Sequence, residues 1–309
     1  MTQDRAEAPP PLPARLPGER ESFAQINGLR LRVREWGDVG LPAVVLLHGL
    51  RGFSGTWRYL ARRLAGQYRL IALDQRGRGD SDWDPGHNYY TDAYLADLEA
   101  LVDQLALDRF TLLGHSMGGT TSYVYASHHP ERLRALIIED IAPGSSIQGA
   151  GAERIVNEMA KLPASFTSWT EARAYWRAAR PSLNDAAIDE RVAESLKATP
   201  TGPITWRYDA EGIRQTRMNP DPARIVDLWP VVDSLRIPTL IVRGGRSDFC
   251  PLATVEAMLS RNPNIRQVTV PDAGHYVHDD APDTFGALIN GFLDETLQTA
   301  TQAGGSHGD

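Results

Sequence analysis

The sequence predicts an α/β fold with a mostly parallel central sheet and helices on both faces. Short runs that are apolar throughout, such as 43–48, 70–73, 110–113 and 135–138, alternate with longer amphipathic stretches. Strands buried on both faces have this continuous apolar pattern, and crossover helices separate them in parallel sheets. Ligand sites of such sheets lie beyond the carboxyl ends of the strands. The polar residues at these ends are His48, Asp74, Ser116 and Asp140.

The first half of the chain supplies a hairpin and the covering helices. Residues 22–34 alternate around Asn27-Gly28, which favours two antiparallel strands joined by a two-residue turn. Residues 56–67 and 93–107 have helical spacing, and a helix over 120–128 is expected to end before Pro130. The expected core therefore opens with an antiparallel pair and continues as a parallel sheet.

The alternation stops between about Gly144 and Arg236, where no convincing strand is visible. Several helical stretches are predicted there, and they suggest a lid over the catalytic edge of the sheet; they cover 152–161, 169–180 and 186–198. The remaining expected elements are a strand over 239–242, a helix over 253–260, a strand over 267–270 and a helix over 283–297. We expect a core of 21–143 and 237–300, a helical lid of 144–236, and flexible ends at 1–20 and 301–309.

Composition excludes several classes of function. A formal net charge of −7 argues against a nucleic-acid or anionic-membrane partner, and the single Cys250 excludes an internal disulfide framework. The first twenty residues contain no apolar signal-peptide core, and no apolar run is long enough to cross a membrane. We expect a cytoplasmic protein that acts on a small acyl substrate, and its oligomeric state stays open.

The segment 112–119 carries the strongest chemical signal. It reads Leu-Leu-Gly-His-Ser-Met-Gly-Gly, in which G-x-S-x-G lies between an apolar strand and a helical run. Such a serine sits on a sharp turn that Gly114 and Gly118 allow to close. The turn exposes the Ser116 hydroxyl beside a helix N-terminus, where developing negative charge is favoured. Ser116 is the candidate nucleophile.

A nucleophilic serine needs a base and a carboxylate that orients the base. His275 lies in a loop after the last predicted strand, and we take it as the base, whereas His278 is interpreted as structural. Two carboxylates fit the third role. We favour Asp248, which follows the strand 239–242, because the order Ser, Asp, His is typical of such sheets. Asp140, at the end of the strand after that of Ser116, is kept as the alternative.

Two backbone N–H groups are expected to hold the oxyanion. One belongs to Met117, the residue after the nucleophile, and the other to Leu50 in His48-Gly49-Leu50. Arg76 and Asp80, in the loop 74–81, are interpreted as residues that fasten this loop. Aromatic residues of a lid usually pack its helices, but some of those in the predicted lid are expected to line an apolar acyl pocket; the candidates are Trp169, Trp176, Trp206, Tyr208 and Trp229.

These motifs resemble those of the lidded α/β-hydrolase superfamily over about residues 22–297. Within it, Asp140-Ile141-Ala142-Pro143 and Arg243-Gly244-Gly245 resemble a group of small carboxylesterases that act on short acyl esters and thioesters. That group can draw its acid from the position of Asp140. The resemblance implies a cofactor-free serine hydrolase.

Three functions therefore stay open. The first is hydrolysis of an ester, lactone or thioester through an acyl-enzyme on Ser116. The second is C–C bond hydrolysis, perhydrolysis, or a biosynthetic acyltransferase or cyclase reaction on the same scaffold, because a fold does not dictate its reaction. The third is a ligand-binding receptor with residual hydrolysis. No metal-ligand spacing or phosphate-binding loop is visible, so no cofactor or metal is expected.

Overall fold

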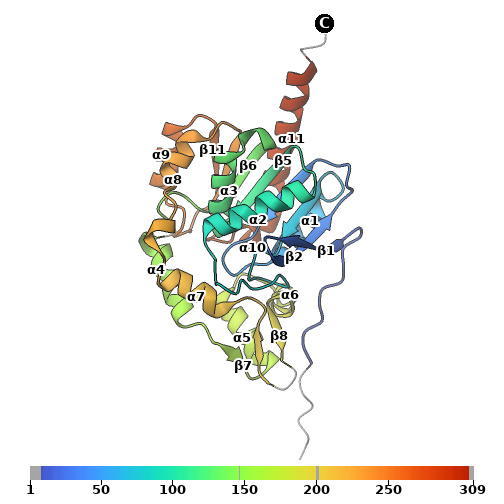
Figure 1. The fold of residues 1–309 in the computed structure, drawn as a ribbon, viewed down its shortest axis with the longest axis vertical. Coiled ribbons are helices and arrows are strands. Elements are labelled where there is room, and N and C mark those ends of the chain that lie inside the picture. The colour runs from blue at the N-terminus through green and yellow to red at the C-terminus, as the bar shows by residue number, and fades with distance from the viewer. Residues whose placement is uncertain (1–7, 146, 200–201, 306–309) are drawn as a thin grey trace, which may run out of the picture.

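The computed structural model describes residues 8–145, 147–199 and 202–305, and its centre is an eight-stranded sheet (Figure 1). The spatial order is β1-β2-β4-β3-β5-β6-β10-β11. The strands are β1 (Arg20–Ile26), β2 (Leu29–Trp36), β3 (Ala43–Leu47), β4 (Arg69–Leu73), β5 (Phe110–His115), β6 (Leu133–Glu139), β10 (Thr239–Gly244) and β11 (Ile265–Val270). β1 pairs antiparallel with β2 and β2 antiparallel with β4, while the other pairings are parallel.

The apolar strand runs arise because both faces of the sheet are covered. Successive side chains of a strand point to opposite faces, so Val45 and Leu47 of β3 pack into one apolar cluster, and Val44 and Leu46 into the other. The helices of the first face are α2 (Thr91–Gln104), α3 (Met117–His128), α8 (Leu228–Ser234) and α9 (Leu252–Arg261). Those of the second are α1 (Arg58–Leu64), α10 (Val277–Asp280) and α11 (Pro282–Gly305). The predicted α/β class is confirmed.

Most of the inserted segment, which runs over residues 144–236 between β6 and β10, lies at one end of the sheet (Figure 1). It contains α4 (Gly149–Ala160), α5 (Trp169–Ala179), α6 (Asp185–Ser195) and α7 (Ala210–Met218). The expectation that it lacks strands is wrong. The short strands β7 (Ser165–Phe166), β9 (Ile204–Trp206) and β8 (Leu196–Ala198) form a separate antiparallel sheet in that order. Strands of two or three residues are too short to produce a period-two pattern.

The limits of the inserted segment and of the chain ends also differ from expectation. α8 lies within the range predicted as lid, but it packs against α3 and α9 of the core. At the start of the chain, Glu19 forms an ion pair with Arg58, with an N–O distance of 3.1 Å. At its end, α11 extends through Gly305 rather than stopping at 297. Residues 1–7 and 306–309 of the ends predicted to be flexible lie outside the described residues.

None of the helices that the structure describes is long and apolar enough to cross a membrane.

Candidate active site

Ser116 lies on a tight turn between β5 and α3. Its backbone has φ 53° and ψ −116°, a conformation that residues other than glycine rarely adopt. Its N–H donates to the Glu139 carbonyl at 3.0 Å. A Cβ atom on Gly114 would lie 2.4 Å from the Gly118 carbonyl oxygen, and one on Gly118 would lie 2.4 Å from that of Leu47. Both glycines of the motif are therefore required by the close approach of neighbouring backbone.

His275 follows β11 and points its ring at Ser116. Its Nε2 atom lies 2.9 Å from the Ser116 Oγ atom. The Phe249 ring stacks on the imidazole with a centroid distance of 4.0 Å, and His115 Nε2 contacts the His275 carbonyl oxygen at 2.9 Å. Burial lowers the pKa of His275 to about 3, and the charges of Arg154 and Arg180 act in the same direction. The ring is therefore neutral near pH 7, which is the form that can accept a proton.

The partner of His275 is Asp140, and the preference for Asp248 is wrong in this respect. Asp140 Oδ2 lies 2.8 Å from His275 Nδ1, and its side chain is completely buried. The Gly244 N–H donates to Oδ1 at 2.8 Å, and the Ser247 hydroxyl donates to Oδ2. Burial raises the pKa of Asp140 to about 7, while these two donors act in the opposite direction. A proton on Nδ1 directed at Asp140 leaves Nε2 as an acceptor for the hydroxyl of Ser116.

Asp248 instead pairs with Arg154 of α4. The Arg154 Nε and Nη2 atoms lie 2.7 and 2.9 Å from its two carboxylate oxygens, and its side chain is 30% exposed. The hydrogen bonds from Arg154 lower the pKa of Asp248. Its position after β10 agrees with the expected chain order, but its side chain joins the sheet edge to the inserted segment.

The difference between the two carboxylates follows from backbone direction. Asp140 comes directly after β6, which is the neighbour of β5, and its φ of 54° is unusual for a non-glycine residue. Asp248 lies beyond a turn that follows the end of β10. Sequence order could not choose between them, because both lie at the same edge of the sheet. The resemblance of 140–143 to small carboxylesterases was the one sequence signal that favoured Asp140.

The expected oxyanion donors lie beside the nucleophile. Leu50 follows β3, Met117 begins α3, and both residues line one cavity. Among the described residues, the N–H groups of Leu50 and Met117 donate to no other group. Two N–H groups free at the same cavity wall can receive a carbonyl oxygen that becomes negatively charged. Arg78 holds this wall in place, since its Nε atom donates to the Leu50 carbonyl at 3.1 Å.

The other polar residues of this edge are held by hydrogen bonds and ion pairs. His48 accepts from the Gln75 N–H at 3.1 Å, and burial lowers the pKa of His48 to about 4. Arg76 contacts Asp97 at 2.6 Å through both Nε and Nη2, as expected of a residue that fastens its loop. Asp80 was also expected to fasten this loop, and its carboxylate accepts hydrogen bonds from Arg32 at 2.9 Å and from Arg207 at 2.6 Å.

His278 lies behind the site rather than in it. Its Nδ1 atom is 2.7 Å from Glu139, and one ligand atom each of His115, Glu139 and His278 could reach a common metal ion. These groups are already hydrogen-bonded, His278 to Glu139 and His115 to the His275 carbonyl. They support the strand end and the loop that carry the site.

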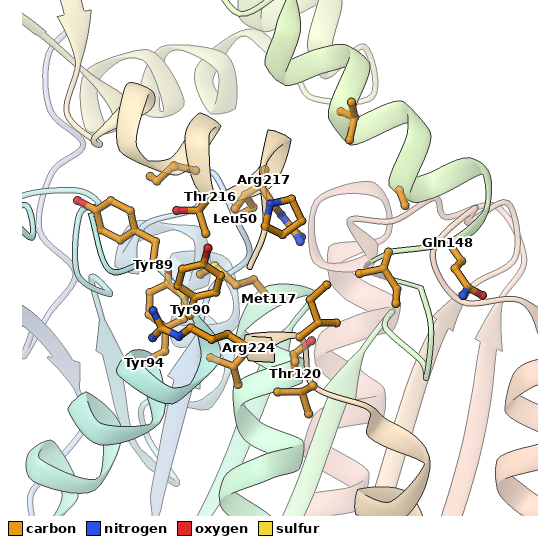
Figure 2. A pocket seen from close by; sticks show the side chains of 18 of the residues that line it. Leu50, Tyr89, Tyr90, Tyr94, Met117, Thr120, Gln148, Thr216, Arg217 and Arg224 are labelled. Carbon is orange, nitrogen blue, oxygen red and sulfur yellow. The ribbon is translucent and has the colours of Figure 1, made fainter. Parts of the chain in front are cut away.

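A cavity of about 910 Å³ opens next to Leu50 and Met117 (Figure 2). Its walls come from the loop after β4, the start of α2, α4, α7 and the segment after α7. Figure 2 shows Tyr89, Tyr90 and Tyr94 at one side, away from Gln148. The aromatic residues expected to contribute to it do not line it. Trp176 and Trp206, for example, pack against each other with a centroid distance of 5.9 Å.

Comparisons with known proteins agree with this fold. A Bacillus subtilis protein named "Putative 2-succinyl-6-hydroxy-2,4-cyclohexadiene-1-carboxylate synthase" is 32% identical over 86% of this chain and 96% of its own length. A 2-(acetamidomethylene)succinate hydrolase of Mesorhizobium japonicum is 30% identical over 87% of this chain and 93% of its own. The crystal structure of an E-2-(acetamidomethylene)succinate hydrolase covers 89% of this chain and 99% of that one, with a TM-score of 0.79 and 26% identity.

Residues 42–282 match the family described as the alpha/beta hydrolase fold. The parallel strands of the sheet, the serine turn between β5 and α3, and the histidine after the last strand all lie within these residues. The chain belongs to the α/β-hydrolase family.

Proposed function

We propose that the protein is a serine hydrolase that cleaves a carboxylic ester, lactone or thioester through an acyl-enzyme on Ser116. One observation carries the proposal. Ser116 Oγ, the two nitrogens of His275 and Asp140 Oδ2 form a continuous chain of hydrogen bonds, with distances of 2.9 and 2.8 Å. Such a chain lets a neutral imidazole take the hydroxyl proton while a carboxylate stabilises the resulting cation.

The reaction follows from the positions of these groups. His275 Nε2 takes the proton of Ser116 as Oγ attacks the substrate carbonyl carbon. The carbonyl oxygen becomes negative and accepts hydrogen bonds from the N–H groups of Leu50 and Met117. His275 then gives its proton to the leaving alcohol or thiol. A water molecule, deprotonated by His275, attacks the acyl-enzyme and releases the carboxylic acid and free Ser116.

The relatives support hydrolysis as the general reaction, although their printed names give different substrates. The synthase name of the B. subtilis relative favours a second candidate, a biosynthetic reaction that uses the same serine. Release of a carboxylic acid in water distinguishes hydrolysis from such a reaction. A burst of acyl-enzyme followed by negligible turnover would instead favour a receptor.

The test is a panel of 4-nitrophenyl esters of increasing chain length, run beside a lactone and an acyl thioester. Ser116→Ala is expected to lower kcat by about 10⁶-fold, as removal of a nucleophile does. Ser127→Ala is the matched control, because Ser127 lies on the helix that follows Ser116 and, among the described residues, its side chain bonds only that of Ser234, at 2.9 Å. Equal activity of the Ser116→Ala variant and the unmodified protein on every substrate would refute the proposal.

A further inference from the structure

The cavity beside the oxyanion donors contains three arginine side chains, of which one is neutralised. Arg224 forms an ion pair with Asp92 and donates to Asn88 Oδ1 at 2.7 Å. Arg78 and Arg217 form no ion pair with any carboxylate in the part of the chain that the structure describes. Because arginine stays protonated in proteins, the cavity wall carries two uncompensated positive charges.

Arg78 is a buried cation whose hydrogen bonds go to neutral groups. Nη1 donates to the Tyr94 hydroxyl at 2.6 Å, Nε to the Leu50 carbonyl at 3.1 Å, and Nη2 contacts Met117 Sδ at 3.4 Å. Its side chain is completely buried. The guanidinium thus holds the two residues expected to supply the oxyanion donors, both of which line the cavity, and places a full positive charge beside them.

Arg217 differs because its donors are not used. It lies on α7, its Nε atom is buried without a hydrogen-bond partner, and no hydrogen bond from its side chain reaches another described residue. Burial lowers the pKa of Arg217, the charge of Arg78 acts in the same direction, and Tyr94 opposes both. One turn earlier on α7, Arg214 is likewise half-buried and donates to Glu211 at 2.8 and 3.0 Å. A single helix therefore carries one paired and one unpaired arginine.

The carboxylate among the residues that line the cavity does not supply a counter-charge for Arg217. Glu153 of α4 is the acidic residue among its lining residues, and it is exposed at the mouth, where it also lines a neighbouring shallow groove with Arg154. Arg217 as a whole is half-buried, so its charge is partly withdrawn from water and gains from a partner. A guanidinium with free donors binds a carboxylate through two parallel hydrogen bonds. The natural partner of Arg217 is therefore an anion that enters the cavity.

We propose that the substrate carries a carboxylate on its acyl chain, and that Arg217 binds this carboxylate while the scissile carbonyl lies at Leu50 and Met117. The inference rests on the proposed function, since it assigns the substrate class of the same site. Arg78 strengthens the attraction by its unpaired charge but has few donors left to offer. The cavity of about 910 Å³ has room for such a chain between the two ends.

The kinetic test compares two esters with acyl chains of equal length, mono-4-nitrophenyl adipate and 4-nitrophenyl hexanoate. We expect the ratio of kcat/KM, adipate monoester over hexanoate, to exceed one and to fall about tenfold to a hundredfold in Arg217→Gln, as expected for loss of a hydrogen bond to a charged group. Arg217→Lys should recover part of the ratio. Arg214→Gln is the matched control on α7 and should leave the ratio unchanged. A ratio that is unaltered in Arg217→Gln would overturn the inference.

A binding measurement separates this inference from the proposed reaction. Calorimetric titration of the Ser116→Ala variant with adipate should show binding that weakens with added salt, and the added substitution Arg217→Gln should weaken it about tenfold or more. If adipate does not bind, and kcat/KM is the same for the adipate monoester and the hexanoate ester, the anion site is refuted while the proposed hydrolysis still stands. Adipate binding that depends on Arg217, without hydrolysis of any ester, would support the site and refute the reaction.

Discussion

The ends of β6 and β10 are neighbours in the sheet, and each leads to an aspartate with a different environment. Asp140 after β6 is completely buried and contacts His275, whereas Asp248 beyond β10 is 30% exposed and pairs with Arg154 of the inserted segment. The end of β10 and the loop after it still serve the site. The N–H of Gly244, the last residue of β10, and the hydroxyl of Ser247 in the loop both donate to Asp140. One strand end thus supplies the carboxylate, and its neighbour supplies the donors that hold it.

This comparison shows that position in the topology identifies candidates but does not assign their roles. The role follows from where the backbone directs the side chain and from which groups remain to pair with it. A buried carboxylate needs donors, and Asp140 has two besides His275. Both carboxylate oxygens of Asp248 accept hydrogen bonds from Arg154, so this carboxylate has little capacity left to orient an imidazole.

Of the changes that test this comparison, Asp140→Asn is expected to have the largest effect. The substitution removes the negative charge beside His275 Nδ1 and favours the wrong tautomer, so kcat should fall by about 10³–10⁴-fold. The measurement is steady-state hydrolysis of the best ester of the panel, with the thermal unfolding curve as a check of folding. A loss below tenfold in a folded variant would place the orienting group elsewhere.

A smaller effect is expected from pH. His275 acts as a base only when neutral, and burial lowers its pKa to about 3, so the active form persists as pH falls below the usual histidine pKa of about 6.5. His275 and Asp140 share one proton, and the measured value belongs to the pair. We expect kcat/KM to stay level as pH falls from 7 through 6.5, and to decline by about tenfold per unit only below a midpoint that lies under 6.5, where the pair takes up a second proton. A midpoint at or above 6.5 would contradict a buried neutral imidazole.

The smallest effect is expected from Asp248→Asn. Its ion pair with Arg154 is about one-third exposed, so its loss should cost less than about 1 kcal/mol of stability and lower kcat about tenfold or less. We propose that this pair restrains a movable inserted segment, and hydrogen exchange over Gly149–Ala160 should therefore accelerate in Asp248→Asn. Arg154→Gln should give the same acceleration, and the double variant no more. Unchanged exchange in both variants would show that the pair restrains nothing.

The sequence predicted the sheet well, because a strand that is buried on both faces has a run of consecutive apolar residues. Each core strand has a continuous apolar run, and the turn around Ser116 requires glycines that are visible in the motif. The contact of His275 with Ser116 also followed, since a loop after the last strand can reach only one edge of the sheet. These features depend on local pattern and chain order alone.

Features that depend on side-chain direction were not predictable in the same way. The choice between Asp140 and Asp248 required the backbone angle at one residue and the donors of another loop. The cavity walls include Tyr89 and Tyr94 near the start of α2. They do not include the tryptophans of the inserted segment, of which Trp176 and Trp206 pack against each other. The unpaired state of Arg217 could not be seen in the sequence, because it depends on the absence of a carboxylate from a three-dimensional neighbourhood.

The rate at which a fluorophosphonate labels Ser116 tests the account most directly, because it measures activation of the serine without knowledge of the natural substrate. The account predicts that peptide mass spectrometry finds the label on Ser116. It also predicts that Asp140→Asn slows labelling by about 10³-fold or more, while Asp248→Asn changes the rate about tenfold or less. A label on another serine, or a slower rate in Asp248→Asn than in Asp140→Asn, would contradict the assignment of Ser116, His275 and Asp140 as the reacting group and its base and acid.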